Sequence, residues 1–221
     1  TAHIGNLGSQ EAIAEEKADI LAGLPRDGIA VLPADTPFIA RLRARAKQAG
    51  ARVLTFGEAA IADVQLTDYI GAAERGTARV LLDGLSCSVH IGAPGQHMAL
   101  NACAVLAAVH ALGLDAIRAA EALSGFGAGA GRGQRVALRL PGGEALLVDD
   151  SYNASAASIR AGLSVLAGQK ATRRIVVLGD MLELGEAGPA MHAGLAGDVA
   201  AVADQVFCCG ALMRHLFEAL P

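Results

Sequence analysis

The sequence predicts an α/β fold in two parts. Strand and helix alternate from Gly28 to Gly57, which is typical of a parallel sheet covered by helices. Glycines are then concentrated in the segment "SGFGAGAGRGQR", and the alternation restarts after it. The composition agrees, because 53% of the 221 residues are hydrophobic and 18% are charged, as expected of helices on a buried sheet.

Caps, proline and glycine separate the elements of the first part. Ser9 suits the N-cap of the first helix, and Pro25 ends that helix by about Leu24. Gly50 closes an amphipathic helix, and Gly84 turns one antiparallel strand into the next. The predicted elements are a helix over 10–24, a strand over 28–33, a helix over 36–50, strands over 51–57, 77–84 and 86–92, and helices over 96–112 and 115–123.

The glycine-rich segment predicts a boundary between domains. We expect a first domain over 1–126, a hinge over 127–133 and a second domain over 134–221. The segment is no dinucleotide fingerprint, because a helix precedes it and a strand follows, and no P-loop pattern occurs in the chain. The elements predicted beyond it are strands over 134–140, 145–148, 174–178 and 205–208, and helices over 155–167, 189–203 and 211–220.

Charge and composition exclude several classes of partner. The net charge of −4 and the lack of a basic run argue against nucleic acid. The most apolar run, Met98 to Leu114, contains Asn101 and His110 and is shorter than the ~20 residues of a membrane span. The four cysteines form no C-x-x-C pair, so we expect reduced core thiols in a cytoplasmic protein with no membrane insertion.

Two adjacent carboxylates give the first indication of a functional site. Asp149 and Asp150 follow the apolar strand over 145–148, which we expect to be buried. Neighbouring acids repel each other and lose solvation, so we expect a metal, an arginine or a ribose opposite them. The alternative is helix capping, since "DSYNAS" is rich in capping residues. Tyr152 and Asn153 beside both acids favour a functional site at the carboxyl edge of a sheet.

Five other positions carry polar side chains that have a structural interpretation, a functional one, or both. Asn101 lies in an alanine-rich helix, where a buried amide needs a partner, either backbone or a nucleotide base. Asp180 follows the strand over 174–178 and is predicted, with Glu183, on the same rim as Asp150, unless both are capping acids. Taken alone, His3 and Lys17 are a structural histidine and a solvated lysine.

Five motifs together resemble the Mur ligases, ATP-dependent amide-forming enzymes of peptidoglycan synthesis. The motifs are "AHIGNLGSQEAIAEEKADI", "PGQHMALNACAVLAA", "GRGQRV", "DDSYNAS" and "VLGDMLELG". The last two are most similar to members that add D-Ala-D-Ala to UDP-N-acetylmuramoyl-tripeptide. The resemblance implies the second half of the central ATP-binding domain, followed by a Rossmann-like C-terminal domain that is incomplete at its end. The family's first domain, its P-loop and its central magnesium-binding glutamate have no counterpart in these residues.

The resemblance also implies roles for individual residues. Two residues would hold Mg²⁺, and the lysine among them would be carbamylated, which turns a cation into a carboxylate-like ligand. The metal ligands would be His3 and Lys17. ATP would be bound by Asn101 at the adenine, by Arg132 at the phosphates and by Asp150 at the ribose. The acceptor substrate would be faced by Asp149, Tyr152 and Asn153.

The activity implied is phosphorylation of the tripeptide carboxylate by ATP, followed by attack of the D-Ala-D-Ala amine on the acyl phosphate. Closure at the glycine hinge would bring Arg132 and Asp150 to the nucleotide, and the chain alone is expected to be inactive. The alternatives are a folylpolyglutamate or cyanophycin synthetase-like ligase, or a non-catalytic nucleotide-binding module. The exposed edge of the truncated central sheet is a candidate surface for self-association.

The chain departs from the family pattern at two places. His97-Met98 stands where the family has His-Asn, which weakens any expectation of a second asparagine at the adenine. Ser155-Ala156 stands where the family has Asn-Pro. We expect this second change to loosen the start of the helix that follows the acid pair.

Overall fold

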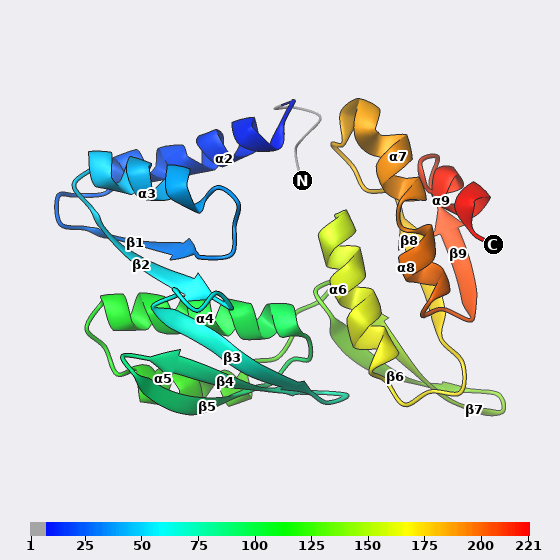
Figure 1. The fold of residues 1–221 in the computed structure, drawn as a ribbon. Coiled ribbons are helices and arrows are strands. Elements are labelled where there is room, and N and C mark those ends of the chain that lie inside the picture. Colours follow the sequence, from blue (N-terminus) through cyan, green and yellow to red (C-terminus); the bar gives the residue numbers. More distant parts are fainter. Residues whose placement is uncertain (1–7) are drawn as a thin grey trace. The chain divides into compact units, whose positions relative to one another are not determined.

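The computed structural model describes residues 8–221, which contain two compact units, Ser9–Phe126 and Gly127–Pro221. Figure 1 shows that each unit consists of helices packed on strands. No helix in the described part of the chain is long and apolar enough to cross a membrane. The predicted metal ligand His3 lies outside the described residues.

A five-stranded mixed sheet forms the centre of the unit Ser9–Phe126. Its strands are β1 (Ile29–Pro33), β2 (Arg52–Gly57), β3 (Val64–Gly71), β4 (Gly76–Leu82) and β5 (Leu85–Ile91), in that spatial order. β1, β2 and β3 are parallel, whereas β3, β4 and β5 are antiparallel. The sequence predicts every strand except β3, whose pairing shifts register between Leu66 and Asp68 and so interrupts the alternation that marks a strand.

Helices cover both faces of this sheet. They are α2 (Gln10–Ala18), the 3₁₀ turn η1 (Asp19–Gly23), α3 (Ile39–Gln48), α4 (Gln96–Ala111), α5 (Ala116–Ala122) and η2 (Leu123–Gly125). Cys103 and Leu106 of α4 are buried in one core with Val80 and Val89 of the sheet. The alternate residues of β1 turn to a second core with η1 and α3, because side chains of a strand point to opposite faces.

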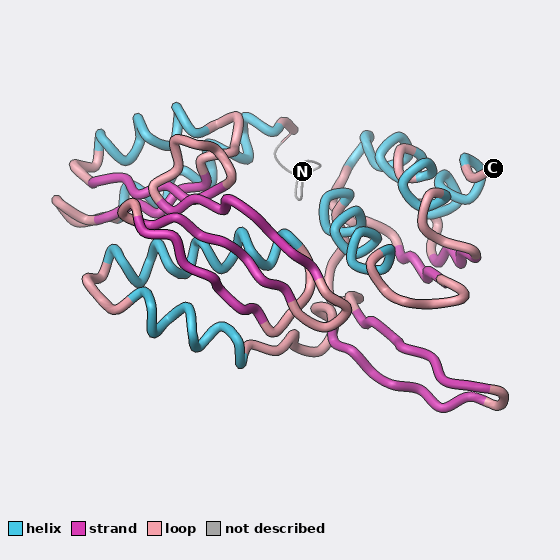
Figure 2. Tube along the Cα trace, turned by 60° about the horizontal axis from the view of Figure 1, so that its bottom comes forward, coloured by secondary structure: helices cyan, strands magenta, loops and turns pink. Residues whose placement is uncertain are grey.

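The unit Gly127–Pro221 begins with an antiparallel hairpin of β6 (Gln134–Leu140) and β7 (Gly143–Asp149). The two-residue turn Pro141-Gly142 suits this geometry, since Gly142 has a φ of +99°. Figure 2 shows the hairpin as a long two-stranded ribbon. The expectation that residues 145–148 are a buried strand is wrong, because the side chains of Leu146 and Leu147 are 45% and 47% exposed.

The rest of this unit packs helices on a parallel strand pair. The elements are α6 (Ala156–Ala167), β8 (Ile175–Gly179), η3 (Gly185–Ala187), α7 (Gly188–Ala193), α8 (Ala196–Ala200), β9 (Gln205–Cys209) and α9 (Met213–Ala219). The helix predicted over 189–203 is therefore two helices, with Gly194 at the C-cap of the first. The core contains the fully buried His192, whose Nε2 accepts from the Met181 N–H at 2.9 Å and whose Nδ1 lies 2.7 Å from the Gly188 carbonyl. A neutral imidazole protonated on Nδ1 satisfies both partners.

Candidate functional site

Two loops that are distant in sequence are joined at the base of the β6–β7 hairpin. We call residues 129–133 the glycine loop and residues 149–153 the acid loop. The N–H of Gly133 donates to the Asp149 carbonyl at 2.8 Å, and the N–H of Tyr152 donates to the Gly131 carbonyl at 2.9 Å. Five of the predicted site residues lie in these two loops: Arg132, Asp149, Asp150, Tyr152 and Asn153.

Gly131 allows the two loops to approach each other. Its φ is +68°, a conformation that strongly favours glycine, and a Cβ there would lie 3.2 Å from the N and Cβ atoms of Tyr152. Next to it, the guanidinium carbon of Arg132 lies 3.9 Å from the centre of the Tyr152 ring. This is a cation–π contact between the loops.

Asp149 accepts hydrogen bonds from groups of its own loop and of the glycine loop. The Ser151 N–H donates to Oδ1 of Asp149 at 3.1 Å. Hydrogen bonds from the Ser151 hydroxyl, then from the backbone N–H groups of Ser151 and Gly131, lower the pKa of Asp149. Asp149 therefore shapes the acid loop as a carboxylate, whereas the predicted alternative, helix capping, is carried out by Ser155.

Asp150 and Asn153 are both exposed. Oδ2 of Asp150 lies 3.7 Å from the position that a Cβ of Gly162 on α6 would take, so the carboxylate sits beside this helix. Oδ1 of Asn153 accepts from the N–H of Ala154 at 2.9 Å. Asp150 and Arg132, the residues predicted for ribose and phosphate, thus lie in neighbouring loops and are accessible to a ligand.

The start of α6 is well capped. Ser155 is the N-cap, and its Oγ accepts from the Ser158 N–H at 3.2 Å while the Ser158 Oγ accepts from the Ser155 N–H at 2.9 Å. This is a reciprocal capping box made by two serines. The expectation that Ser155-Ala156 loosens this helix start is wrong, because serine is as good an N-cap as asparagine.

Asp180 caps a helix. Its Oδ1 accepts from the Met213 N–H, at the start of α9, at 2.7 Å. A Cβ at Gly210 would lie 2.4 Å from the same carboxylate, so Asp180 fills the place of a side chain there. β7 and β8 also belong to different sheets, so the prediction that one sheet edge carries both Asp150 and Asp180 is wrong.

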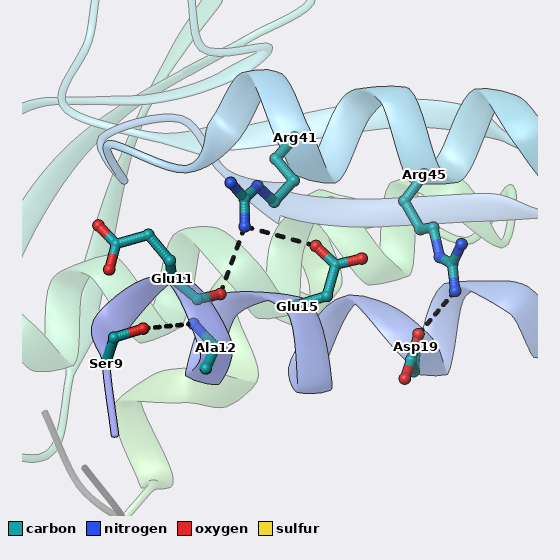
Figure 3. A network of polar contacts seen from close by, with 7 residues as sticks. All are labelled: Ser9, Glu11, Ala12, Glu15, Asp19, Arg41 and Arg45. Atoms are coloured by element: carbon teal, nitrogen blue, oxygen red, sulfur yellow. Dashed lines mark hydrogen bonds and ion pairs between the residues drawn. The ribbon is translucent and has the colours of Figure 1, made fainter. Parts of the chain in front are cut away.

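Lys17 is exposed in the last turn of α2. Two ion pairs hold α2 and the first residue of η1 against α3, as Figure 3 shows. They join Arg41 to Glu15 at 3.4 Å and Arg45 to Asp19 at 2.7 Å. Lys17 is roughly 200° around the helix from Glu15, because each residue turns an α-helix by about 100°. The contact with α3 therefore leaves the lysine free of that interface.

Asn101 is exposed on α4, so the expectation that its amide is buried is wrong.

The start of α4 is held by a residue that sequence reasoning missed. The Tyr69 hydroxyl on β3 accepts from the Gly95 N–H at 2.6 Å, and Gln96 Nε2 donates to Glu58 Oε1 at 2.6 Å. No pattern marks a single tyrosine in a strand as the anchor of a distant helix, so only the structure reveals Tyr69.

The described residues hold neither a metal-ligand cluster nor a reactive buried thiol. Residues 8–221 contain no group of three or more His, Cys, Asp and Glu side chains that could hold a metal ion. All four cysteines are free, but only Cys103 is buried and Cys209 is exposed, so the expectation that all are core thiols is wrong. Burial raises the pKa of Cys103 to about 12, so this thiol stays protonated and is no nucleophile.

Comparison with protein families gives two matches. Residues 1–109 match the Mur ligase middle domain, and residues 131–220 match the Mur ligase, glutamate ligase domain. The two matches lie on either side of the segment that contains the boundary between the compact units.

Curated relatives and solved structures agree with these matches. The UDP-N-acetylmuramoyl-tripeptide--D-alanyl-D-alanine ligase of Bacillus subtilis is 30% identical over 98% of this chain and 45% of its own length. The ligase of the same name from Mycobacterium tuberculosis H37Rv is 35% identical over 87% of this chain and 38% of its own length.

Two crystal structures have the same fold as this chain. MurF from Acinetobacter baumannii matches with a TM-score of 0.90 and 28% identity, over 100% of this chain and 47% of the other. MurF from Thermotoga maritima, solved in complex with ADP, matches with a TM-score of 0.81 and 25% identity, over 97% of this chain and 48% of the other. The chain thus spans less than half the length of each of these four proteins.

Proposed function

We propose, because this chain belongs to the Mur ligase family, that the complete protein is a cytoplasmic ATP-dependent ligase that adds D-Ala-D-Ala to UDP-N-acetylmuramoyl-tripeptide. The names of the two curated relatives support this substrate pair. The proposal concerns the complete gene product, since the relatives are more than twice as long as the matched region.

One observation carries the proposal at the level of residues. Two backbone hydrogen bonds tie the loop that bears Arg132 to the loop that bears Asp150. A guanidinium is the side chain best suited to phosphate oxygens, and a carboxylate accepts from the two hydroxyls of a ribose. The pair therefore suits a nucleotide, and the Thermotoga relative was solved with ADP.

Asn101 is the third nucleotide ligand that we propose. Its exposed amide offers both a donor and an acceptor, which an adenine edge requires. Asp149, already a carboxylate, and Asn153 are proposed for the acceptor side of the site. Asp149 would act mainly by fixing the acid loop, since it is held by Ser151.

The reaction transfers the γ-phosphoryl group of ATP to the terminal carboxylate of the tripeptide. The amine of D-Ala-D-Ala then attacks the acyl phosphate carbon, and phosphate leaves as the amide forms. Such steps need positioning and neutralisation of phosphate charge more than covalent help from the protein. Arg132 would supply part of that neutralisation.

Magnesium is the second cofactor that we propose. Bound Mg²⁺ would neutralise phosphate charge, with His3 and a carbamylated Lys17 as ligands. An unmodified lysine ammonium has no lone pair for a metal, so only the carbamate would fit. The described residues offer no ligand cluster to complete such a site, and no step above depends on it.

The test is a ligase assay of the complete gene product. Purified protein is given ATP and UDP-N-acetylmuramoyl-tripeptide with D-Ala-D-Ala, with L-alanine or with glutamate, and the amide product is identified by mass spectrometry. The expected result is phosphate release coupled to one product, the D-Ala-D-Ala adduct. Coupling to another amino acid, or ATP binding with no turnover, would contradict the proposal.

Two variants test the nucleotide residues. Arg132→Gln and Asp150→Asn each remove a charge-assisted hydrogen bond, so we expect the KM for ATP to rise about ten-fold or more. The matched controls are Arg139→Gln and Glu144→Gln, which remove an exposed charge from the same hairpin. Equal ATP affinity in all four variants would exclude the two loops from the nucleotide site.

A further inference from the structure

We infer that Tyr152 is a positioning residue for Arg132: its ring holds the guanidinium in place before nucleotide binds. This inference rests on the proposed function, because it assumes that Arg132 meets the phosphates of ATP. It differs from the prediction that Tyr152 faces the acceptor substrate.

The geometry supports a fixed ring rather than a chance contact. The guanidinium carbon lies 3.9 Å from the ring centre, well within the range of a cation–π contact. The backbone of Tyr152 is itself tied to the glycine loop by its hydrogen bond to Gly131. The hydrogen bond thus ends on Tyr152 itself and on Gly131, the residue directly before Arg132.

A ring in this place reduces the freedom of a long side chain. An exposed arginine samples many rotamers, and binding a phosphate requires one of them. Stacking on the ring selects a subset in advance, which lowers the cost of binding. A guanidinium has five N–H donors, so a contact with one ring leaves donors for phosphate oxygens.

The contact uses the ring and not the hydroxyl. Phenylalanine should therefore replace Tyr152 in this role, whereas leucine should not. Phe217 on α9 provides a matched control, since its side chain is 67% exposed and that of Tyr152 is 68% exposed. Phe217→Leu thus removes an equally exposed ring from the same unit.

The kinetic experiment compares Tyr152→Leu, Tyr152→Phe and Phe217→Leu in the complete gene product. We expect Tyr152→Leu to raise the KM for ATP about three-fold, the size of an exposed cation–π contact. The KM for D-Ala-D-Ala and kcat should stay constant, and Tyr152→Phe should restore the KM for ATP. In an Arg132→Gln background, Tyr152→Leu should add nothing.

A second measurement does not depend on turnover. In the 221-residue chain, the ring current should shift the Arg132 Nε–H resonance in NMR spectra, and the shift should vanish in Tyr152→Leu but persist in Tyr152→Phe. An active enzyme whose KM for ATP is unchanged or lowered by Tyr152→Leu, or whose KM for D-Ala-D-Ala rises instead, overturns the inference. An enzyme without ligase activity, with the NMR shift present, overturns the proposed function and leaves the contact established.

Discussion

At the scale of single residues, Gly131 has the clearest physical requirement in the candidate site. Its positive φ strains any other residue, and a Cβ there would make a tight contact of 3.2 Å with Tyr152. The sequence shows five glycines within nine residues but does not distinguish their roles. Gly129, two residues earlier, has no atom within 4 Å of a Cβ position and no positive φ, so it could carry a side chain.

We therefore expect Gly131→Ala to destabilise the joined loops by about 1–2 kcal/mol, the cost of a left-handed conformation for an L-residue. Gly129→Ala should be neutral or slightly stabilising, because alanine restricts the unfolded chain. Amide hydrogen exchange of Gly133 and Tyr152, whose N–H groups join the loops, measures the difference. Equal exchange in both variants would contradict the role given to Gly131.

Asp149 makes the acid loop sensitive to acid. A carboxyl whose pKa is lowered by folding adds stability above its unfolded pKa, and this stability is lost as the pH falls through the folded pKa. Ser151→Ala removes the largest cause of the lowered pKa, so we expect the pKa of Asp149 to rise. Carboxyl ¹³C NMR of the chain during an acid titration checks this. An unchanged pKa would show that backbone donors alone set it.

At the scale of elements, α6 joins the acid loop to the core. Leu163 on this helix is buried in the core of the second unit, and the serine capping box fixes the first turn. Arg160 on the same helix pairs with Asp198 of α8 at 2.7 Å. The residues after Asn153 are thus held firmly, which limits how far the acid loop can move.

Removal of the cap should weaken this anchor. We expect Ser155→Ala to cost about 1 kcal/mol in the free energy of unfolding, since it leaves an N–H of the first turn without its acceptor. Ser164→Ala, the same change at an exposed position inside α6, should change it by less than about 0.5 kcal/mol. Urea titrations of the chain compare the two. A cost that is no larger for Ser155→Ala would contradict the capping role.

Most elements follow from local sequence signals, and the failures have local reasons. The N-cap Ser9 and the closing Gly50 are where the sequence predicts them. β3 is missed because of its register shift. Gly194 is a possible stop signal, but it keeps a helical φ of −64° and α8 begins two residues later, so the sequence predicts one helix. How strands group into sheets depends on packing between distant segments. The position of β7 in an exposed hairpin could therefore not be read from residues 145–148.

The candidate site is only partly readable from the sequence. Chemistry-bearing side chains are conspicuous there, so Arg132, Asp150 and Tyr152 are named as candidates. Their arrangement cannot be read from the sequence, because Arg132 and Tyr152 are twenty residues apart. A backbone hydrogen bond between Tyr152 and Gly131 brings their loops together. The exposure of Asn101 is similarly set by what covers α4, which periodicity does not reveal.

At the scale of the molecule, the two compact units meet in sequence between Phe126 and Gly127. The hinge over 127–133 stays a prediction, and limited proteolysis tests it. Elastase cleaves after small residues, and Gly127, Gly129 and Ala130 are exposed. We expect the first cut between residues 127 and 130, with both products resistant to further digestion. A first cut at the Pro141-Gly142 turn would argue against a hinge over 127–133.

The placement of Tyr69 and Tyr152 gives the chain a built-in optical probe in each half. The protein has two tyrosines and no tryptophan, and one phenol lies in each compact unit. Tyr69 is bound through its hydroxyl, whereas Tyr152 is stacked under a guanidinium. Their emission should therefore respond to different events, so that Tyr69→Phe and Tyr152→Phe each leave a single fluorophore that follows one half without an added dye.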